Sequence, residues 1–373
     1  MTHRERLLAV IDGKHLDRIP WIPRLHLWYN AHKQNGTLPE KYQHLTLRDI
    51  ERDLGLGTPA REGRIHIVNQ KGNIETKSYR KGVETITEYI TPAGTVWTST
   101  RGSDELAQKG IGGRTTAYMI KNKDDYAVVE YMVENTEYIP AYDAYIAYEG
   151  DIGEDGYPKI LLGSAPMGQI MREYIGYNNF YYELADNLAQ IEHLHGILVD
   201  KAKELWKIVL ESPAKLFLYG VHFDSQFTPP PLFAQYFLPY FQEFSALLHQ
   251  NDQLIACHAD ADTSLLLDLI MAAGFDMAES FVTSPMVPVT LKQARQAWGN
   301  NVIIWGGIPS AIMCEPITDE DFEEYMLDLF QTIAPGDAFI LGVADNVMPE
   351  AKIERVKRVT EMVDEYGQYP ITM

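Results

Sequence analysis

Apolar runs and helix-like stretches alternate along the second half of the chain. Predicted strands lie at 159–166, 215–226, 254–260, 277–280, 302–307 and 338–345, and amphipathic helical patterns lie at 187–211, 231–250, 263–273, 291–298, 319–333 and 351–365. This rhythm is typical of consecutive βα units in a parallel sheet. A Gly-x-Gly-x-x-Gly phosphate loop follows none of these strands. The pattern therefore predicts an α/β fold, a closed (β/α)8 TIM barrel rather than an open nucleotide-binding sheet.

The first 156 residues have a different texture. Thr2 and Glu5 have the spacing of a capping box at the start of a helix that Gly13 ends, and an apolar stretch at 20–24 is a candidate first barrel strand. Alternating polar and apolar residues at 83–101, around a Pro-Ala-Gly turn, predict a β-hairpin. We therefore expect one barrel domain over 1–373, with a β-rich insertion after the N-terminal segment, at roughly 71–156.

Composition narrows the partners and the compartment. The net charge of −20 argues against a nucleic-acid or anionic-membrane face, which needs clustered Lys and Arg. The two cysteines, Cys257 and Cys314, cannot form a disulfide framework, and no apolar run approaches membrane-spanning length. We therefore expect a cytoplasmic protein with no nucleic-acid or membrane partner. The sequence leaves the oligomeric state open, a homodimer included.

Polar residues lie at the ends of three predicted strands, those at 254–260, 277–280 and 338–345. Strand alternation points His258 and Asp260 the same way, and Glu279 and Asp345 end two later strands. In a barrel these ends converge on one rim, so we predict His258, Glu279 and Asp345 as catalytic residues. One imidazole and three carboxylates also form an oxygen-rich ligand set, with which His258, Asp260, Glu279 and Asp345 could hold zinc.

Each of these residues also has a purely structural interpretation. Asp260 would orient a core histidine or cap a helix, Glu279 would form a salt bridge with a neighbouring Arg or Lys, and Asp345 would cap a turn. These alternatives remain open from the sequence.

Three further residues are candidates for binding substrate. His222 and Asp224 share a face of the predicted strand at 215–226, and Arg24 ends the predicted first strand, where it could meet an anionic group.

Several segments resemble the uroporphyrinogen decarboxylase superfamily. They are the opening ERLLAVIDGKHLDRIPWIPR, the stretch GVADNVMP and the ending DEYGQYP, and the resemblance covers most of the chain outside the insertion. True decarboxylases carry an arginine-rich RQAGR segment where this chain reads RLHLWYN, with Arg24 alone, and a His where it has Asp345. The resemblance therefore favours the superfamily's other branch, the corrinoid-dependent methyltransferases.

That branch implies methyl transfer between a small molecule and a cobalamin carried on a separate corrinoid-binding protein. Members that act on coenzyme M hold zinc with a His-x-Cys pair and a later Cys. His258 matches that His, Asp260 stands for the first Cys and Asp345 lies near the second. Carboxylates in place of thiolates point to demethylation of a small O-methyl substrate, aryl methyl ethers included, or an N-methyl substrate. The alternative is a decarboxylase of the uroporphyrinogen type in porphyrin biosynthesis.

Overall fold

The computed structural model describes residues 1–103, 106–107 and 112–373, which form two compact units. The first unit comprises Met1–Gly63, Ile146–Leu162 and Ala214–Met373, and the second comprises Arg64–Tyr145 and Gly163–Pro213. The predicted insertion at roughly 71–156 is divided between the two units at position 145. A single barrel domain with a β-rich insertion there stays a prediction.

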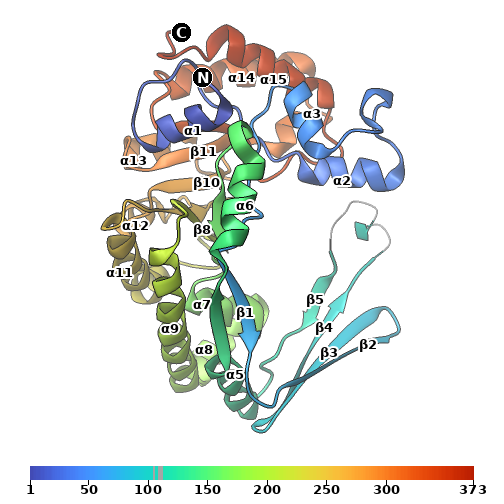
Figure 1. Ribbon diagram of the computed structural model, residues 1–373, viewed down its shortest axis with the longest axis vertical. Helices are drawn as coiled ribbons and strands as arrows, with labels where there is room; N and C mark the ends of the chain where they lie inside the picture. The colour runs from blue at the N-terminus through green and yellow to red at the C-terminus, as the bar shows by residue number, and fades with distance from the viewer. Residues whose placement is uncertain (104–105, 108–111) are drawn as a thin grey trace. The chain divides into compact units, whose positions relative to one another are not determined.

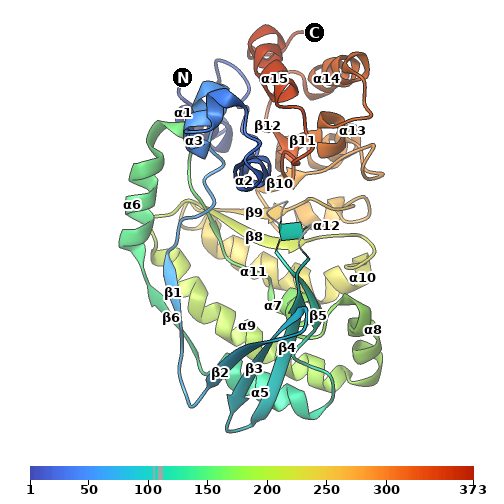
Figure 2. The same cartoon turned by 90° about the vertical axis from the view of Figure 1, so that its right-hand side faces the viewer.

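A six-stranded parallel sheet is the centre of the first unit (Figure 2). Its strands follow one another in chain order: β7 (Lys159–Leu161), β8 (Leu216–His222), β9 (Leu254–His258), β10 (Met277–Phe281), β11 (Ile303–Pro309) and β12 (Phe339–Ala344). Apolar side chains of neighbouring strands, such as Ala256, Met277 and Ile340, form the core. The structure thus confirms a mixed α/β fold and the predicted strands. Nearly continuous burial of β9 to β12 agrees with a parallel sheet that is covered on both faces.

Helices connect these strands as the sequence predicts. After β8 and each later strand come α10 (Pro230–Leu232), η4 (Phe233–Phe237) and α11 (Leu238–His249), then α12 (Leu267–Ala272), α13 (Leu291–Trp298), α14 (Asp319–Ile333) and α15 (Ile353–Tyr366). The helix predicted at 231–250 is divided, because the π-helical turn η4 precedes Pro239. Pro239 has no backbone N–H to donate, and it lies in the first turn of α11, where no such donor is needed.

The N-terminal segment contacts both edges of this sheet. It contains α1 (His3–Ile11), α2 (His26–Asn35), η1 (Glu40–Tyr42) and α3 (Leu47–Asp53), and the predicted capping box of Thr2 and Glu5 is present. The stretch predicted as a first strand forms a parallel bridge between Trp21 and Leu341 of β12. At the other edge the Lys159 N–H donates to the Ala60 carbonyl at 3.0 Å, and the Gly57 N–H donates to the Trp21 carbonyl at 3.0 Å.

The second unit is built on a four-stranded antiparallel sheet (Figure 1). Its strands are β2 (Glu75–Lys81), β3 (Glu84–Thr91), β4 (Gly94–Arg101) and β5 (Arg114–Ala117). The predicted hairpin is the β3–β4 pair, which closes where Thr91 pairs with Gly94. The edge strand β2 exposes all seven of its residues, and these include Glu75, Lys77, Arg80 and Lys81.

Helices and a second, smaller sheet complete this unit. Helix α5 (Asp124–Glu134) packs on β3 and β4, and β1 (His66–Gln70) pairs with β6 (Thr136–Pro140). The remaining elements are α7 (Pro166–Gln169), η3 (Ile170–Tyr174), α8 (Tyr177–Asp186) and α9 (Leu188–Glu211); α6 (Tyr142–Ile152) crosses from this unit into the first, where η2 (Gly153–Asp155) follows it. None of the helices described has the length and apolar character needed to cross a membrane.

Candidate functional site

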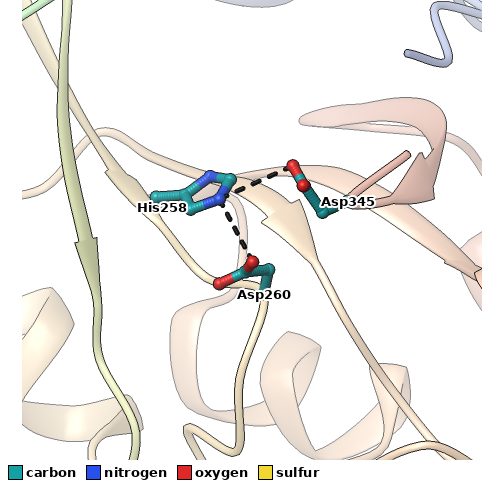
Figure 3. A group of neighbouring side chains, drawn as sticks. All are labelled: His258, Asp260 and Asp345. Atoms are coloured by element: carbon teal, nitrogen blue, oxygen red, sulfur yellow. Dashed lines mark ion pairs between the residues drawn. The ribbon is translucent and has the colours of Figure 1, made fainter. Parts of the chain in front are cut away.

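Three of the predicted residues meet at the carboxyl ends of β9 and β12 (Figure 3). His258 is the last residue of β9, Asp260 follows it by two positions, and Asp345 directly follows β12. The His258 Nε2 atom lies 3.3 Å from Asp260 Oδ2 and 3.6 Å from Asp345 Oδ1. The imidazole is buried, whereas both aspartates are partly exposed. The structure therefore brings these three side chains to one point.

Glu279 lies on the opposite side of the imidazole. Its Oε2 atom is 2.6 Å from Nδ1 of His258, and its Oε1 atom accepts a 2.7 Å hydrogen bond from Lys159 Nζ. Both Glu279 and Lys159 are almost fully buried. Both carboxylate oxygens of Glu279 are thus engaged on the Nδ1 side of the ring, away from the two aspartates, and its place in the ligand set stays a prediction. Its place is that of a positioning residue, which fixes the ring of His258 through Nδ1.

Three cations complete the site. Arg24, a predicted substrate residue, contacts Asp345. Arg61 Nη1 lies 3.5 Å from Glu279 Oε1 and 3.7 Å from Asp345 Oδ1. Lys159 lies over the ring of Trp305, with Nζ 3.4 Å from the ring centroid.

Two of these cations, Lys159 and Arg61, were not predicted from the sequence. The sequence could have indicated a role for Lys159, because a lysine inside an apolar strand is rarely buried without a charged partner. The sequence gives no such indication for Arg61, since this residue belongs to an irregular stretch between helices and strands.

Burial and charge determine the protonation of the central groups. Burial by itself would lower the pKa of His258, but the charges of Glu279 and Asp260 outweigh it and raise this pKa to about 9. Burial lowers the pKa of Lys159 to about 7 despite the opposing effect of Glu279. Burial would raise the pKa of Glu279, yet Lys159 and its other cationic neighbours hold it well below its usual range. The imidazole is thus a cation at neutral pH, between a buried carboxylate and two aspartates.

The other predicted substrate residues have different surroundings. Asp224 accepts backbone N–H groups of Gln226 at 2.8 Å and Phe227 at 3.2 Å, so it caps the turn after β8. The side chain of His222 lies outside the part of the chain that the structure describes. Cys314 donates its thiol to the Ser310 carbonyl at 3.5 Å, as expected for a packed loop thiol.

A cavity of about 710 Å³ adjoins the charged cluster within the first unit. Arg24 and Arg61 are on its lining, and its apolar walls include Tyr29, Leu47 and Ile152. This volume falls in the usual range of small-molecule sites. The cavity therefore offers room for a small molecule beside Arg24 and Arg61, the two arginines that contact Asp345; His258 and the two aspartates are not on its lining.

Glu51 has a buried carboxyl group on the wall of this cavity. We expect this group to make the free energy of unfolding depend on pH. It accepts a 2.7 Å hydrogen bond from Thr58, and burial raises its pKa to about 7. Between pH 4.5 and 7 the unfolded chain loses this proton while the folded chain keeps it, so the free energy of unfolding falls by roughly 3 kcal/mol as pH rises. We expect Glu51→Gln to remove this fall, as measured by chemical unfolding at pH 4.5 and 8. An equal pH dependence of the free energy of unfolding in the wild type and in Glu51→Gln would contradict the raised pKa of Glu51.

The geometry of the three clustered residues fits a zinc ion. One ligand atom from each of His258, Asp260 and Asp345 lies within 4.8 Å of the others. Ligand atoms at about 2.0–2.2 Å from a tetrahedral zinc lie roughly 3.4 Å apart, close to the spacings given above. The Glu279 contact at Nδ1 is the usual outer support of a metal-bound histidine. Three protein ligands would leave a fourth position for a reacting group.

Comparison with known proteins places the chain in a family. A search of curated proteins finds no match. Among solved structures, a methyltransferase from Methanosarcina mazei has a TM-score of 0.59 at 15% identity, covering 98% of this chain and 99% of that one, which shows a shared fold. The model of the uroporphyrinogen decarboxylase (URO-D) family matches residues 167–366, more than half of the chain, and that span holds His258, Asp260, Glu279 and Asp345. The chain therefore belongs to the uroporphyrinogen decarboxylase family.

Proposed function

We propose that this protein is a corrinoid-dependent methyltransferase that demethylates a small O-methyl or N-methyl substrate. The observation that carries the proposal is the imidazole of His258, which Glu279 fixes at Nδ1 and which presents Nε2 to two aspartates beside a cavity. Family membership and a fold shared with a methyltransferase support this choice. A corrinoid on a separate partner protein would supply the nucleophile that accepts the methyl group.

The residues of the site act on the leaving group in this mechanism. Loss of a methyl group from an ether leaves a developing alkoxide or phenolate, whose negative charge must be offset. His258 holds a proton at Nε2, because its pKa is raised to about 9, and transfers that proton to the leaving oxygen. Asp260 and Asp345 lie on the Nε2 side of the ring, and Asp260 helps to keep the proton there. Zinc held by His258, Asp260 and Asp345 would supply Lewis-acid stabilisation in place of the proton.

We further propose that the parallel sheet closes into a (β/α)8 barrel through the segments at 20–24 and 57–61. The bridge from Trp21 to β12 and the hydrogen bonds of Gly57 and Lys159 support this arrangement. Closure would place the candidate site at the carboxyl-terminal mouth, where barrel enzymes carry their chemistry.

Reconstitution tests the reaction directly. The purified protein is incubated with reduced cobalamin and a panel of methoxy compounds and methylamines, and formation of methylcobalamin is followed by its absorption spectrum. We expect turnover with at least one class. A panel that yields no methylcobalamin, together with carbon dioxide release from uroporphyrinogen, would replace the proposal with the decarboxylase alternative.

Metal binding is predicted separately from activity. With zinc at the three-residue cluster, the protein should bind one equivalent, and Asp260→Asn should weaken binding by at least tenfold, since it removes an anionic ligand. Dialysis against zinc, followed by elemental analysis, measures the stoichiometry. Asp262→Asn is a matched control, because Asp262 lies in the same loop and binds Ser264. Equal zinc content in the wild type and Asp260→Asn would exclude this ligand set.

A further inference from the structure

Three arginines supply the positive charge on the lining of the 710 Å³ cavity: Arg24, Arg48 and Arg61. Two of them are already neutralised by carboxylates. Arg48 donates to Asp151 at 2.6 Å and to Asp155 at 2.8 Å. Arg24 contacts Asp345. Neither of these guanidinium groups is available for a bound anion without loss of an existing ion pair.

Arg61 differs from the other two. It makes no hydrogen bond within the part of the chain that the structure describes, and its buried Nη1 atom is without a hydrogen-bond partner. Its two ionic contacts, to Glu279 and Asp345, are longer than a hydrogen bond. A guanidinium has five N–H donors, and a buried donor left unused is costly. A carboxylate is the partner that would use two of these donors at once.

The surroundings of Arg61 limit the rest of the ligand. Its contacts with Glu279 and Asp345 place an anion bound to it beside the His258 cluster. The walls formed by Tyr29, Leu47 and Ile152 suit an apolar body. Three acidic residues also line the cavity: Glu51, Glu62 and Asp151. Asp151 is paired with Arg48, so the charge of Glu62 is the one that would repel a second anionic group.

From these contacts we propose that Arg61 is the specificity-determining residue of the cavity and binds the single carboxylate of an apolar substrate. The methyl group in this inference rests on the proposed function. Together with the carboxylate, it makes the substrate class a methoxylated monocarboxylic acid. One guanidinium whose buried Nη1 has no hydrogen-bond partner suits one carboxylate, whereas a tetrapyrrole polyacid would need several such groups.

Calorimetric binding tests this inference without any corrinoid. The ligands are 4-methoxybenzoate and its neutral partner 4-methoxybenzamide. We expect the wild type to bind the acid at least tenfold more tightly than the amide, and Arg61→Gln to abolish that preference. Arg61→Lys keeps the charge but loses the two-pronged geometry, so it should keep part of the preference. Arg80→Gln, on the exposed strand β2, makes the same charge change and should leave binding unaltered.

Clear outcomes would overturn the proposal. Equal affinity of the wild type for the acid and the amide would do so, as would an undiminished preference in a folded Arg61→Gln protein. Should Arg61→Gln fail to fold, a reduced preference for the acid in Arg61→Lys would support the role of the guanidinium, and an unchanged preference would refute it. Tighter binding of benzene-1,3,5-tricarboxylate than of the monoacid would refute the single-anion assignment.

The same ligands separate this inference from the proposed reaction. Acid binding that depends on Arg61, without methyl transfer from any substrate, would support the anion site and contradict the methyltransferase. Demethylation of neutral methoxybenzamide as fast as the acid, unchanged in Arg61→Gln, would support the methyltransferase and contradict the anion site.

Discussion

Replacement of His258 by glutamine is expected to lower the rate of demethylation at least about a thousandfold. General acid catalysis by a positioned side chain contributes about 10² to 10⁴ in rate, and His258 would also be lost as a ligand for zinc. Glutamine still fills part of the space and can hydrogen-bond with Glu279, so the change tests chemistry more than packing. The measurement is the single-turnover rate of methylcobalamin formation with saturating substrate.

A second histidine provides the control for this experiment. His249 pairs with Asp276 at 3.0 Å at the C-terminal end of α11, and its side chain is 42% exposed. His249→Gln therefore makes the same substitution at another histidine–carboxylate pair, and the rate should stay within about twofold of wild type, as the pair is outside the proposed mechanism. A loss of less than tenfold in His258→Gln, or equal losses in both variants, would remove His258 from the mechanism.

Removal of Glu279 is expected to be the most destabilising single change at the site. Glu279→Leu leaves the ammonium of Lys159 buried without its 2.7 Å partner, and breaking such a pair costs about 3–5 kcal/mol. The loss should be smaller at pH 9 than at pH 6. Burial already lowers the pKa of Lys159 to about 7, so in the folded variant the lysine can shed its proton as pH rises, while the unfolded chain keeps it.

A double-mutant cycle isolates the pair. Lys159→Met combined with Glu279→Leu should be less destabilising than the sum of the two single changes, by more than about 1 kcal/mol. Urea unfolding of the wild type, the two single variants and the double variant measures the coupling free energy between Lys159 and Glu279. The partly exposed pair of Asp12 and Lys215, at 2.6 Å, is the control, and Asp12→Asn should cost less than about 1 kcal/mol. Additive losses in the buried pair would mean that Lys159 and Glu279 do not stabilise one another.

The regular elements of the first unit could be predicted because their signals are local. Long apolar runs predicted the strands β9 to β12. Helical periodicity predicted α13 and α14 with the bounds that the structure shows. Strand alternation also predicted the approach of His258 and Asp260, which needs only neighbouring residues. The stretch predicted as a first strand forms only a single bridge, between Trp21 and Leu341, and the apolar pattern at 20–24 carries no information on how far this pairing extends.

A salt bridge of Glu279 was one of the interpretations open from the sequence, but its partners could not be predicted, since they depend on backbone detail and on a residue far away in the chain. The register of β10 against β11 shifts between Glu279 and Phe281, and Ser280 has a left-handed φ of 57°. This irregularity accompanies an arrangement in which Glu279 points to Nδ1 of His258 while Ser280 reaches Asp345 at 3.3 Å. Lys159 lies 120 positions earlier in the chain, so no short motif links it to Glu279.

The exposed edge strand β2 has a consequence for solubility. An unpaired strand edge can add a strand from another molecule and so begin aggregation. Here the edge carries Glu75, Lys77, Arg80 and Lys81, all exposed. Any incoming strand would have to desolvate these charges, so their presence works against intermolecular β-sheet growth at high protein concentration.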